Sequence, residues 1–175
     1  MLKLMNELDE VWAQKLNQAI SDAQTAGRTD IADYLTLKAA NDLLRQTSVK
    51  WLFDSMTEIA AFANRANVQI TLETDTPHNF EFAKANMVGA RLRLLFGVRC
   101  LTLEAGWTRT PSDGFMRGGA LAAARFLHFG MTKQNEEIIL LREADAPQWF
   151  SVNGEGRRAV FNSIHLQKHF ETFRG

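Results

Sequence analysis

The sequence predicts an α+β fold, in which helices at the N-terminus pack on a largely antiparallel β-sheet and one helix follows at the C-terminus. Through residues 1–66 the apolar residues recur with the helical period of about 3.6. From residue 67 to 161 most of them alternate with the period of two that half-buried strands show. The helical period returns at 163–173. Because helices and strands are segregated along the chain, the pattern indicates α+β and not α/β, and we expect a single domain over residues 1–175.

About three antiparallel helices are expected in the N-terminal part, because the links between the periodic segments are short. The first is predicted over residues 3–26 and the second over about 31–47. A third, over 49–66, is predicted because Thr47 or Ser48 would suit its N-cap position.

A β-hairpin is the firmest prediction in the sheet. Gly97 stands between two alternating runs, and glycine at the first loop position suits a type II′ turn, which needs a positive φ there. The resulting register pairs Leu92 with Leu103, Leu94 with Leu101, Phe96 with Arg99, Arg93 with Thr102 and Arg91 with Glu104. A slip of one residue would place leucines opposite polar side chains, so the turn and the apolar pattern select the same register.

Two other segments each fit two structures. Residues 77–88 fit a short helix that begins at a Thr-Pro pair, which we favour, or an edge strand with Phe80 and Phe82 on one face. Residues 118–129 are rich in alanine, which suits a helix, but the flanking glycines and the neighbouring strands favour a strand.

The remaining elements follow the same signals, giving a sheet of about 5–6 strands. Further strands are expected at 67–74, 138–142, 149–152 and 157–161. The Asn-Gly-Glu-Gly sequence between the last two strands is a hairpin signal. Ser163 or Asn162 is expected to cap the final helix, 163–173.

Composition narrows the class of protein. Hydrophobic residues make up 46% and charged residues 23%, as in globular proteins. The net charge of zero argues against a dedicated, charge-driven nucleic-acid binder. A single cysteine, Cys100, excludes an internal disulfide and is expected to be a packed thiol. Since the first ten residues are polar and acidic, and no apolar run approaches the roughly 20 residues of a membrane span, we expect a cytoplasmic protein.

The loop 107–119 is the candidate recognition site. It carries two arginines, whose planar forks of donors suit carboxylates or phosphates, and two aromatic side chains that offer stacking surface. The candidate binding residues are Trp107, Arg109, Phe115 and Arg117, together with Arg93. The alternative is that the two aromatic side chains are buried in the core and anchor an ordinary long loop.

A second interpretation of the same region is single-stranded nucleic-acid binding. Residues 81–129 carry seven Lys and Arg against three Asp and Glu, while residues 1–80 carry seven against eleven. The arginines that would form a basic stripe beside aromatic residues are Arg91, Arg93, Arg99, Arg109, Arg117 and Arg125. The acidic first part of the chain disfavours this interpretation, as does the expected pairing of Arg91 with Glu104.

No metal or cofactor is expected. His165 and His169 stand four residues apart on a predicted helix, as two metal ligands would, but no third or fourth ligand accompanies them. We therefore expect them on a solvated helix surface, and His78 at a helix terminus.

For catalysis, Glu104, Asp113 and His128 are the acid/base candidates near the central hairpin, and they would have to lie within hydrogen-bond reach of one another or of a substrate. Nucleophile-elbow, phosphate-loop, dinucleotide and zinc-protease motifs are all missing. No catalytic residue is assigned, and the balance favours a protein that is not an enzyme.

The favoured function is a non-catalytic, cytoplasmic binding or regulatory domain that recognises a protein or an anionic ligand through loop 107–119. The N-terminal helices carry Trp12, Tyr34 and Trp51 beyond their inward stripes, so self-association as a homodimer is expected there. The alternatives are that this aromatic surface binds a partner or packs on the sheet. The alternatives are a single-stranded nucleic-acid-binding protein, and a small hydrolase or transferase that uses His128 with Asp113 or Glu104. The identity of the partner and the oligomeric state stay open.

Overall fold

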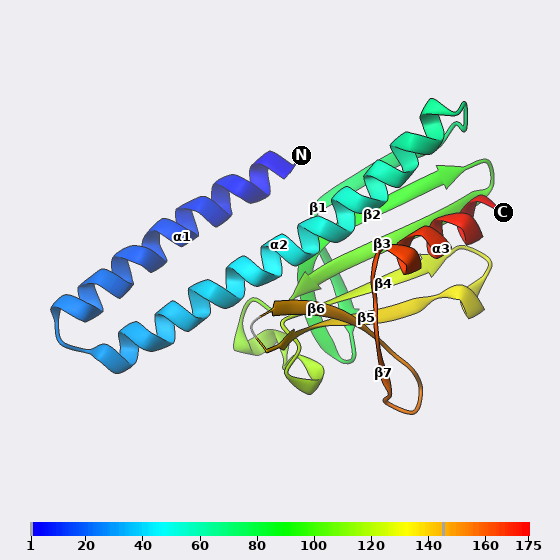
Figure 1. Cartoon of the computed structure of the whole chain (residues 1–175). Helices are drawn as coiled ribbons and strands as arrows, with labels where there is room; N and C mark the ends of the chain where they lie inside the picture. The colour runs from blue at the N-terminus through cyan, green and yellow to red at the C-terminus, as the bar shows by residue number, and fades with distance from the viewer. Residues whose placement is uncertain (1, 145) are drawn as a thin grey trace. The chain divides into compact units, whose positions relative to one another are not determined.

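The computed structural model in Figure 1 describes residues 2–144 and 146–175, without the side chains of residues 2–9 and 117. Its helices and strands are α1 (Leu2–Thr25), α2 (Thr29–Arg65), β1 (Thr71–Phe82), β2 (Ala85–Phe96), β3 (Arg99–Trp107), β4 (Ala122–His128), β5 (Glu136–Glu143), β6 (Ala146–Val152), β7 (Arg158–Val160) and α3 (Ser163–Arg174). This order of N-terminal helices, antiparallel sheet and C-terminal helix confirms the predicted α+β class. None of the helices within the described residues combines the length and the apolar character that a membrane crossing requires.

The chain divides into two compact units, Met1–Gln46 and Thr47–Gly175. The first unit is a helical hairpin of α1 and the first part of α2, in which Leu16, Ala23 and Ala32 are buried. Between the two helices, the ammonium of Lys38 lies 5.3 Å from the ring centroid of Trp12. The second unit contains the rest of α2, the whole sheet and α3.

Helix α2 is continuous where the sequence predicted two helices, so the predicted break at Thr47 and Ser48 is wrong. Thr and Ser side chains suit N-caps, but inside a helix their hydroxyls can instead bond to a carbonyl one turn earlier. Thr36 does this in the same helix, donating from Oγ1 to the carbonyl oxygen of Ala32 at 2.8 Å. Thr47 and Ser48 therefore resemble an N-cap in the sequence, although the helix continues through them.

The seven described strands form one antiparallel sheet in sequence order, β1 to β7. The hairpin of β2 and β3 has the predicted register at all five predicted pairs, and Gly97 has a φ of 57°. Arg91 lies opposite Glu104 as predicted, but its guanidinium binds Asp75 on β1 instead. The leucine pattern and the glycine turn thus predicted the backbone pairing correctly. The ion pair of Arg91 was not predicted, because the sequence did not show that β1 lies beside β2.

One face of the sheet is covered by helices. The second part of α2, drawn in cyan in Figure 1, lies over it together with α3, drawn in red. The buried apolar side chains of this face and of the helices over it include Leu92, Leu94, Leu101, Leu103, Phe126, Leu140, Leu52, Met56, Leu166 and Phe170. The amphipathic stripes predicted for α2 and α3 are therefore the surfaces that close this core.

The opposite face of the sheet has a core of its own because the sheet curls. Phe80 and Phe82 of β1 cluster with Ile139 of β5 and Phe150 of β6. In a flat sheet β1 and β5 would lie about 19 Å apart, since neighbouring strands are about 4.8 Å apart. Arg125 of β4 also donates to the main-chain oxygen of Glu81 on β1 at 3.1 Å, so β1 curls over the middle strands on this face.

Two glycines face one another across β2 and β3. Gly89 pairs with Gly106 across the two strands. A Cβ atom added at Gly89 would lie 1.9 Å from the carbonyl oxygen of Ala105, and one added at Gly106 would lie 2.7 Å from that of Val88. Both positions therefore require glycine for the backbones to approach as they do.

The predicted helix at 77–88 is wrong, because this segment forms the end of β1, a tight turn and the start of β2. The edge-strand alternative is confirmed, with Phe80 and Phe82 both buried on one face and His78 within β1 and not at a helix end. The proline is tolerated because the β1–β2 register is interrupted between Asp75 and His78. In the other ambiguous segment, 118–129, the observed strand β4 confirms the strand prediction.

Candidate functional site

The first half of the predicted recognition loop, 107–119, is an ordered turn. Trp107 is buried at the end of β3, and the guanidinium of Arg109 lies 4.0 Å from the centre of its indole. The Asp113 carboxylate accepts hydrogen bonds from the main-chain nitrogens of Thr110 at 2.8 Å and Arg109 at 3.0 Å. These bonds lower the pKa of Asp113, which acts here as a structural cap for the turn.

The second half of the loop presents Phe115, whose side chain is 90% exposed. The preceding residue, Gly114, packs against the β1–β2 turn, where an added Cβ would lie 3.3 Å from Ala85. The side chain of Arg117 is outside the described part of the chain. Of the predicted binding residues, the structure therefore brings Trp107 and Arg109 into contact and places Phe115 on the same loop.

Arg93 does not join this group. Val88 is the β2 partner of Trp107, and Arg93 lies five residues further along the strand, about 17 Å away. Its guanidinium donates to Glu73 at 2.9 Å.

Most of the predicted basic stripe is bonded within the protein. Arg91 donates to Asp75, Arg93 to Glu73, Arg125 to Glu104 and Arg99 to the carbonyl oxygen of Phe173. Three of these four bonds join an arginine to a carboxylate, which reduces the positive potential that a nucleic-acid strand would meet.

The three acid/base candidates do not converge. Glu104 pairs with Arg125 and His128 pairs with Leu101, so the alternation of side chains along β3 and β4 directs Glu104 and His128 to opposite faces of the sheet. Glu104 is buried and accepts hydrogen bonds from Arg125 Nε at 2.5 Å and from His78 Nε2 at 2.7 Å. Asp113 lies apart from both, in the loop turn.

A chain of polar side chains that was not predicted from the sequence lies between the sheet and α3. Ser151 Oγ donates to Glu136 at 2.5 Å, and His169 Nε2 donates to the other oxygen of the same carboxylate at 2.8 Å. The other ring nitrogen of His169, Nδ1, shares a hydrogen bond of 3.0 Å with Nε2 of His128. We call Ser151, Glu136, His169 and His128 the polar chain.

Hydrogen bonding sets the charge state of Glu136 in the polar chain, and burial sets that of His128. The hydrogen bond from His169 lowers the pKa of Glu136 and keeps it ionised. Burial, reinforced by His169, lowers the pKa of His128 to about 4, so this imidazole is neutral near pH 7. Its Nδ1 atom has no hydrogen-bond partner within the described residues.

The expectation that His169 lies on a solvated helix surface is wrong. His169 follows Leu166 by one helical turn and shares its buried face of α3. His165 instead completes the N-terminal cap of α3, where its Nδ1 accepts a hydrogen bond from the main-chain nitrogen of Asn162 at 3.3 Å. No three His, Cys, Asp or Glu side chains in the described part of the chain are arranged to hold a metal ion.

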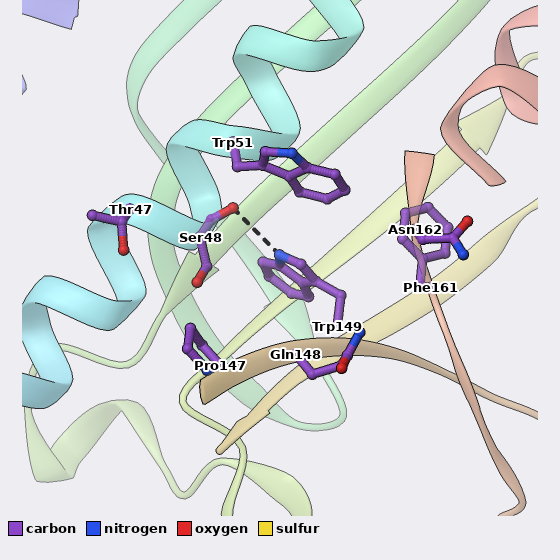
Figure 2. Close-up of a pocket in the computed structure, with 8 residues that line it drawn as sticks. All are labelled: Thr47, Ser48, Trp51, Pro147, Gln148, Trp149, Phe161 and Asn162. Carbon is purple, nitrogen blue, oxygen red and sulfur yellow. Dashed lines mark hydrogen bonds between the residues drawn. The ribbon is translucent and has the colours of Figure 1, made fainter. Parts of the chain in front are cut away.

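A separate cleft opens between α2, β6 and the start of α3, and Figure 2 shows the indoles of Trp51 and Trp149 projecting into it. It has a volume of about 300 Å³. The residues that line it are Thr47, Ser48, Trp51, Pro147, Gln148, Trp149, Phe161 and Asn162. We call this the tryptophan cleft. The helical pattern indicated that Trp51 lies outside the inward stripe of its helix, but no local pattern places it beside Trp149, almost one hundred positions later.

A comparison with protein-family models, with curated proteins and with solved structures found no significant match to this chain.

Proposed function

We propose that this chain is a non-catalytic, cytoplasmic binding domain that recognises a partner protein through loop 107–119. The observation that supports this is the 90% exposure of Phe115 on a loop whose backbone is held by the Asp113 cap and by packing at Gly114. An aromatic side chain on an ordered backbone loses little conformational freedom on binding, and such residues are frequent hot spots of protein interfaces.

The charge beside Phe115 favours a partner that carries carboxylates. Arg109 is exposed and is oriented by stacking on Trp107, so its donors are pre-arranged for a planar acceptor. Lys84 adds a second exposed cation in the β1–β2 turn, against which Gly114 packs. The proposed partner surface therefore combines an apolar pocket for the phenylalanine ring with acidic groups for Arg109.

Capture from an extract of the source cells, followed by quantitative mass spectrometry, tests this function. We expect Phe115→Ala and Arg109→Glu each to reduce recovery of the specific partner by about tenfold or more, as the loss of a hot-spot residue does. Phe129→Ala is the matched control, because Phe129 is also exposed, at 75%, but lies on the loop after β4. Unchanged recovery with Phe115→Ala, or an equal loss with Phe129→Ala, would contradict the proposal.

The two alternative functions have less support. Nucleic-acid binding would depend on arginines that already bind Asp75, Glu73 and Glu104. A hydrolase or transferase that uses His128 with Glu104 would need both groups on one face of the sheet, whereas the β3–β4 register directs them to opposite faces. A binding constant that falls steeply with salt would favour the nucleic-acid alternative over the protein partner.

Self-association through the N-terminal helices is the second part of the proposal. In the first unit Tyr34 and Leu37 are exposed, one helical turn apart on α2. A hairpin of two helices buries little apolar surface on its own, so pairing with a second hairpin to form a four-helix bundle would stabilise it.

A further inference from the structure

We propose that the tryptophan cleft is a binding site for an uncharged ring compound that carries hydrogen-bonding groups on its edge. This site is independent of the proposed partner surface, since no residue of loop 107–119 lines it. Three properties of the cleft lead to the ligand class, namely its walls, its polar groups and its lack of charge.

The walls of the cleft are formed before any ligand enters. Trp149 is only 4% exposed, and its Nε1 donates to the main-chain oxygen of Ser48 at 3.3 Å, so its indole cannot turn freely. Trp51 is 38% exposed and projects from α2 into the same space, as Figure 2 shows. The accessible indole of Trp51 therefore offers stacking surface to a ring, and the fixed indole of Trp149 forms a rigid apolar wall beside it.

The polar groups are neutral amides. The Asn162 side chain uses its oxygen to cap α3, where it accepts from the nitrogen of Ile164 at 3.0 Å, and its Nδ2 donates to no group within the described residues. The side-chain amide of Gln148, which also lines the cleft, makes no hydrogen bond in that part of the chain either. The cleft thus contains donors and an acceptor that suit the polar edge of a ring.

The absence of charge excludes ions as the preferred ligand. None of the eight residues described as lining the cleft has a charged side chain. A charged compound would lose part of its hydration on entry without gaining a counter-charge, which is unfavourable. With about 300 Å³, the cleft is at the lower end of the volumes of small-molecule sites and suits one ring or two fused rings. A planar heterocycle and a sugar ring share these properties.

The experiment is a titration of the whole chain followed by tryptophan fluorescence and by the four indole N–H signals in NMR spectra. Uridine and methyl glucoside are the neutral probes, and benzoate and benzylammonium are smaller rings that carry a charge. We expect saturable binding of a neutral probe at concentrations up to about 10 mM, with a shift of the Trp149 indole signal. Binding of uridine alone would identify a planar heterocycle as the ligand, and binding of methyl glucoside alone would identify a sugar ring.

Trp51→Ala should weaken that binding by about tenfold, the loss expected for one stacked ring, and because Trp51 is partly exposed the fold should be retained. Trp12→Ala is the matched control, since Trp12 belongs to the first unit. Equal or tighter binding of either charged ring would overturn the proposal. So would a failure of both neutral probes to saturate, or an equal loss of affinity in Trp12→Ala.

Discussion

The imidazoles of His128 and His169 meet in a hydrogen bond of 3.0 Å between Nε2 and Nδ1, although 41 residues separate them along the chain. Their rings are nearly stacked, with an interplanar angle of 25°, and the ring of Phe126 lies against His169 at a centroid distance of 4.3 Å. On its other side, His169 donates from Nε2 to the carboxylate of Glu136 at 2.8 Å, so the pair of imidazoles is anchored to a carboxylate.

The first prediction is that stability depends on pH through His128. Its pKa is about 4 in the folded protein, against about 6.5 when unfolded, so between these values the unfolded chain binds more protons. The contribution of neutral His128 to the free energy of unfolding should therefore be complete above pH 6.5. The free energy of unfolding should fall by on the order of 3 kcal/mol as the pH is lowered to about 4. Urea denaturation across this pH range measures it.

A variant separates this effect from general acid unfolding. His128→Gln should flatten the pH dependence between about 6.5 and 4, whereas His165→Gln, at the cap of α3, should leave it in place. Below this window the depressed pKa of Glu136 should add a further loss of stability, since the folded state holds that carboxylate ionised. An unchanged slope in His128→Gln would contradict the assignment.

The second prediction concerns the buried carboxylate of Glu104. Glu104→Ala should lower the free energy of unfolding by about 3 kcal/mol, because it leaves Arg125 and His78 without their shared acceptor. Glu73→Ala removes a carboxylate from an exposed pair with Arg93 and should cost less than about 1 kcal/mol. Chemical denaturation of both variants makes the comparison, and similar losses would show that burial of Glu104 contributes nothing.

The third prediction tests the curl of the sheet. Phe82→Ala should destabilise the protein by about 3–5 kcal/mol, because its ring is buried in the cluster with Ile139 and Phe150. Phe62→Ala, at a helix position that is 69% exposed, should change stability by less than about 0.5 kcal/mol. A small effect of Phe82→Ala in thermal unfolding would mean that β1 does not close over that face.

The fourth prediction concerns self-association. Leu37→Glu places a charge on the exposed face of α2 in the first unit and should convert a dimer into a monomer without loss of the sheet. Sedimentation at several concentrations measures the mass, with Val98→Glu as the control at an even more exposed apolar position, in the β2–β3 turn of the second unit. A wild-type chain that is monomeric at all concentrations would remove this part of the proposed function.

The parts of the fold that the sequence predicted are those with local signals. Gly97 and the alternating leucines on either side of it specify one hairpin, and that register is present. The β1–β2 hairpin lacked such a signal, because its turn has positive φ at Ala83 and Lys84, two residues that seldom mark turns. The period of two near Phe80 was present in the sequence, but the Thr-Pro pair before it carried a stronger helix-start signal.

The candidate sites show the same division between local and distant contacts. The cap made by Asp113 and the stacking of Arg109 on Trp107 lie within seven residues of one chain segment. The polar chain and the tryptophan cleft each join side chains that are far apart in sequence and meet only when helices cover the sheet. Periodicity shows which face a residue occupies on its own element, but it does not show which distant residue lies opposite it.

The facing pair of Gly89 and Gly106 has a consequence for finding relatives of this protein. Apolar side chains of the two cores can exchange with others of similar volume as sequences diverge, so they leave a weak record of common ancestry. Neither glycine can exchange in this way, because a Cβ atom at either site would overlap main-chain atoms of the neighbouring strand. Two glycines on either side of a glycine-turned hairpin, at this spacing, are therefore the signature that a distant homologue should keep longest.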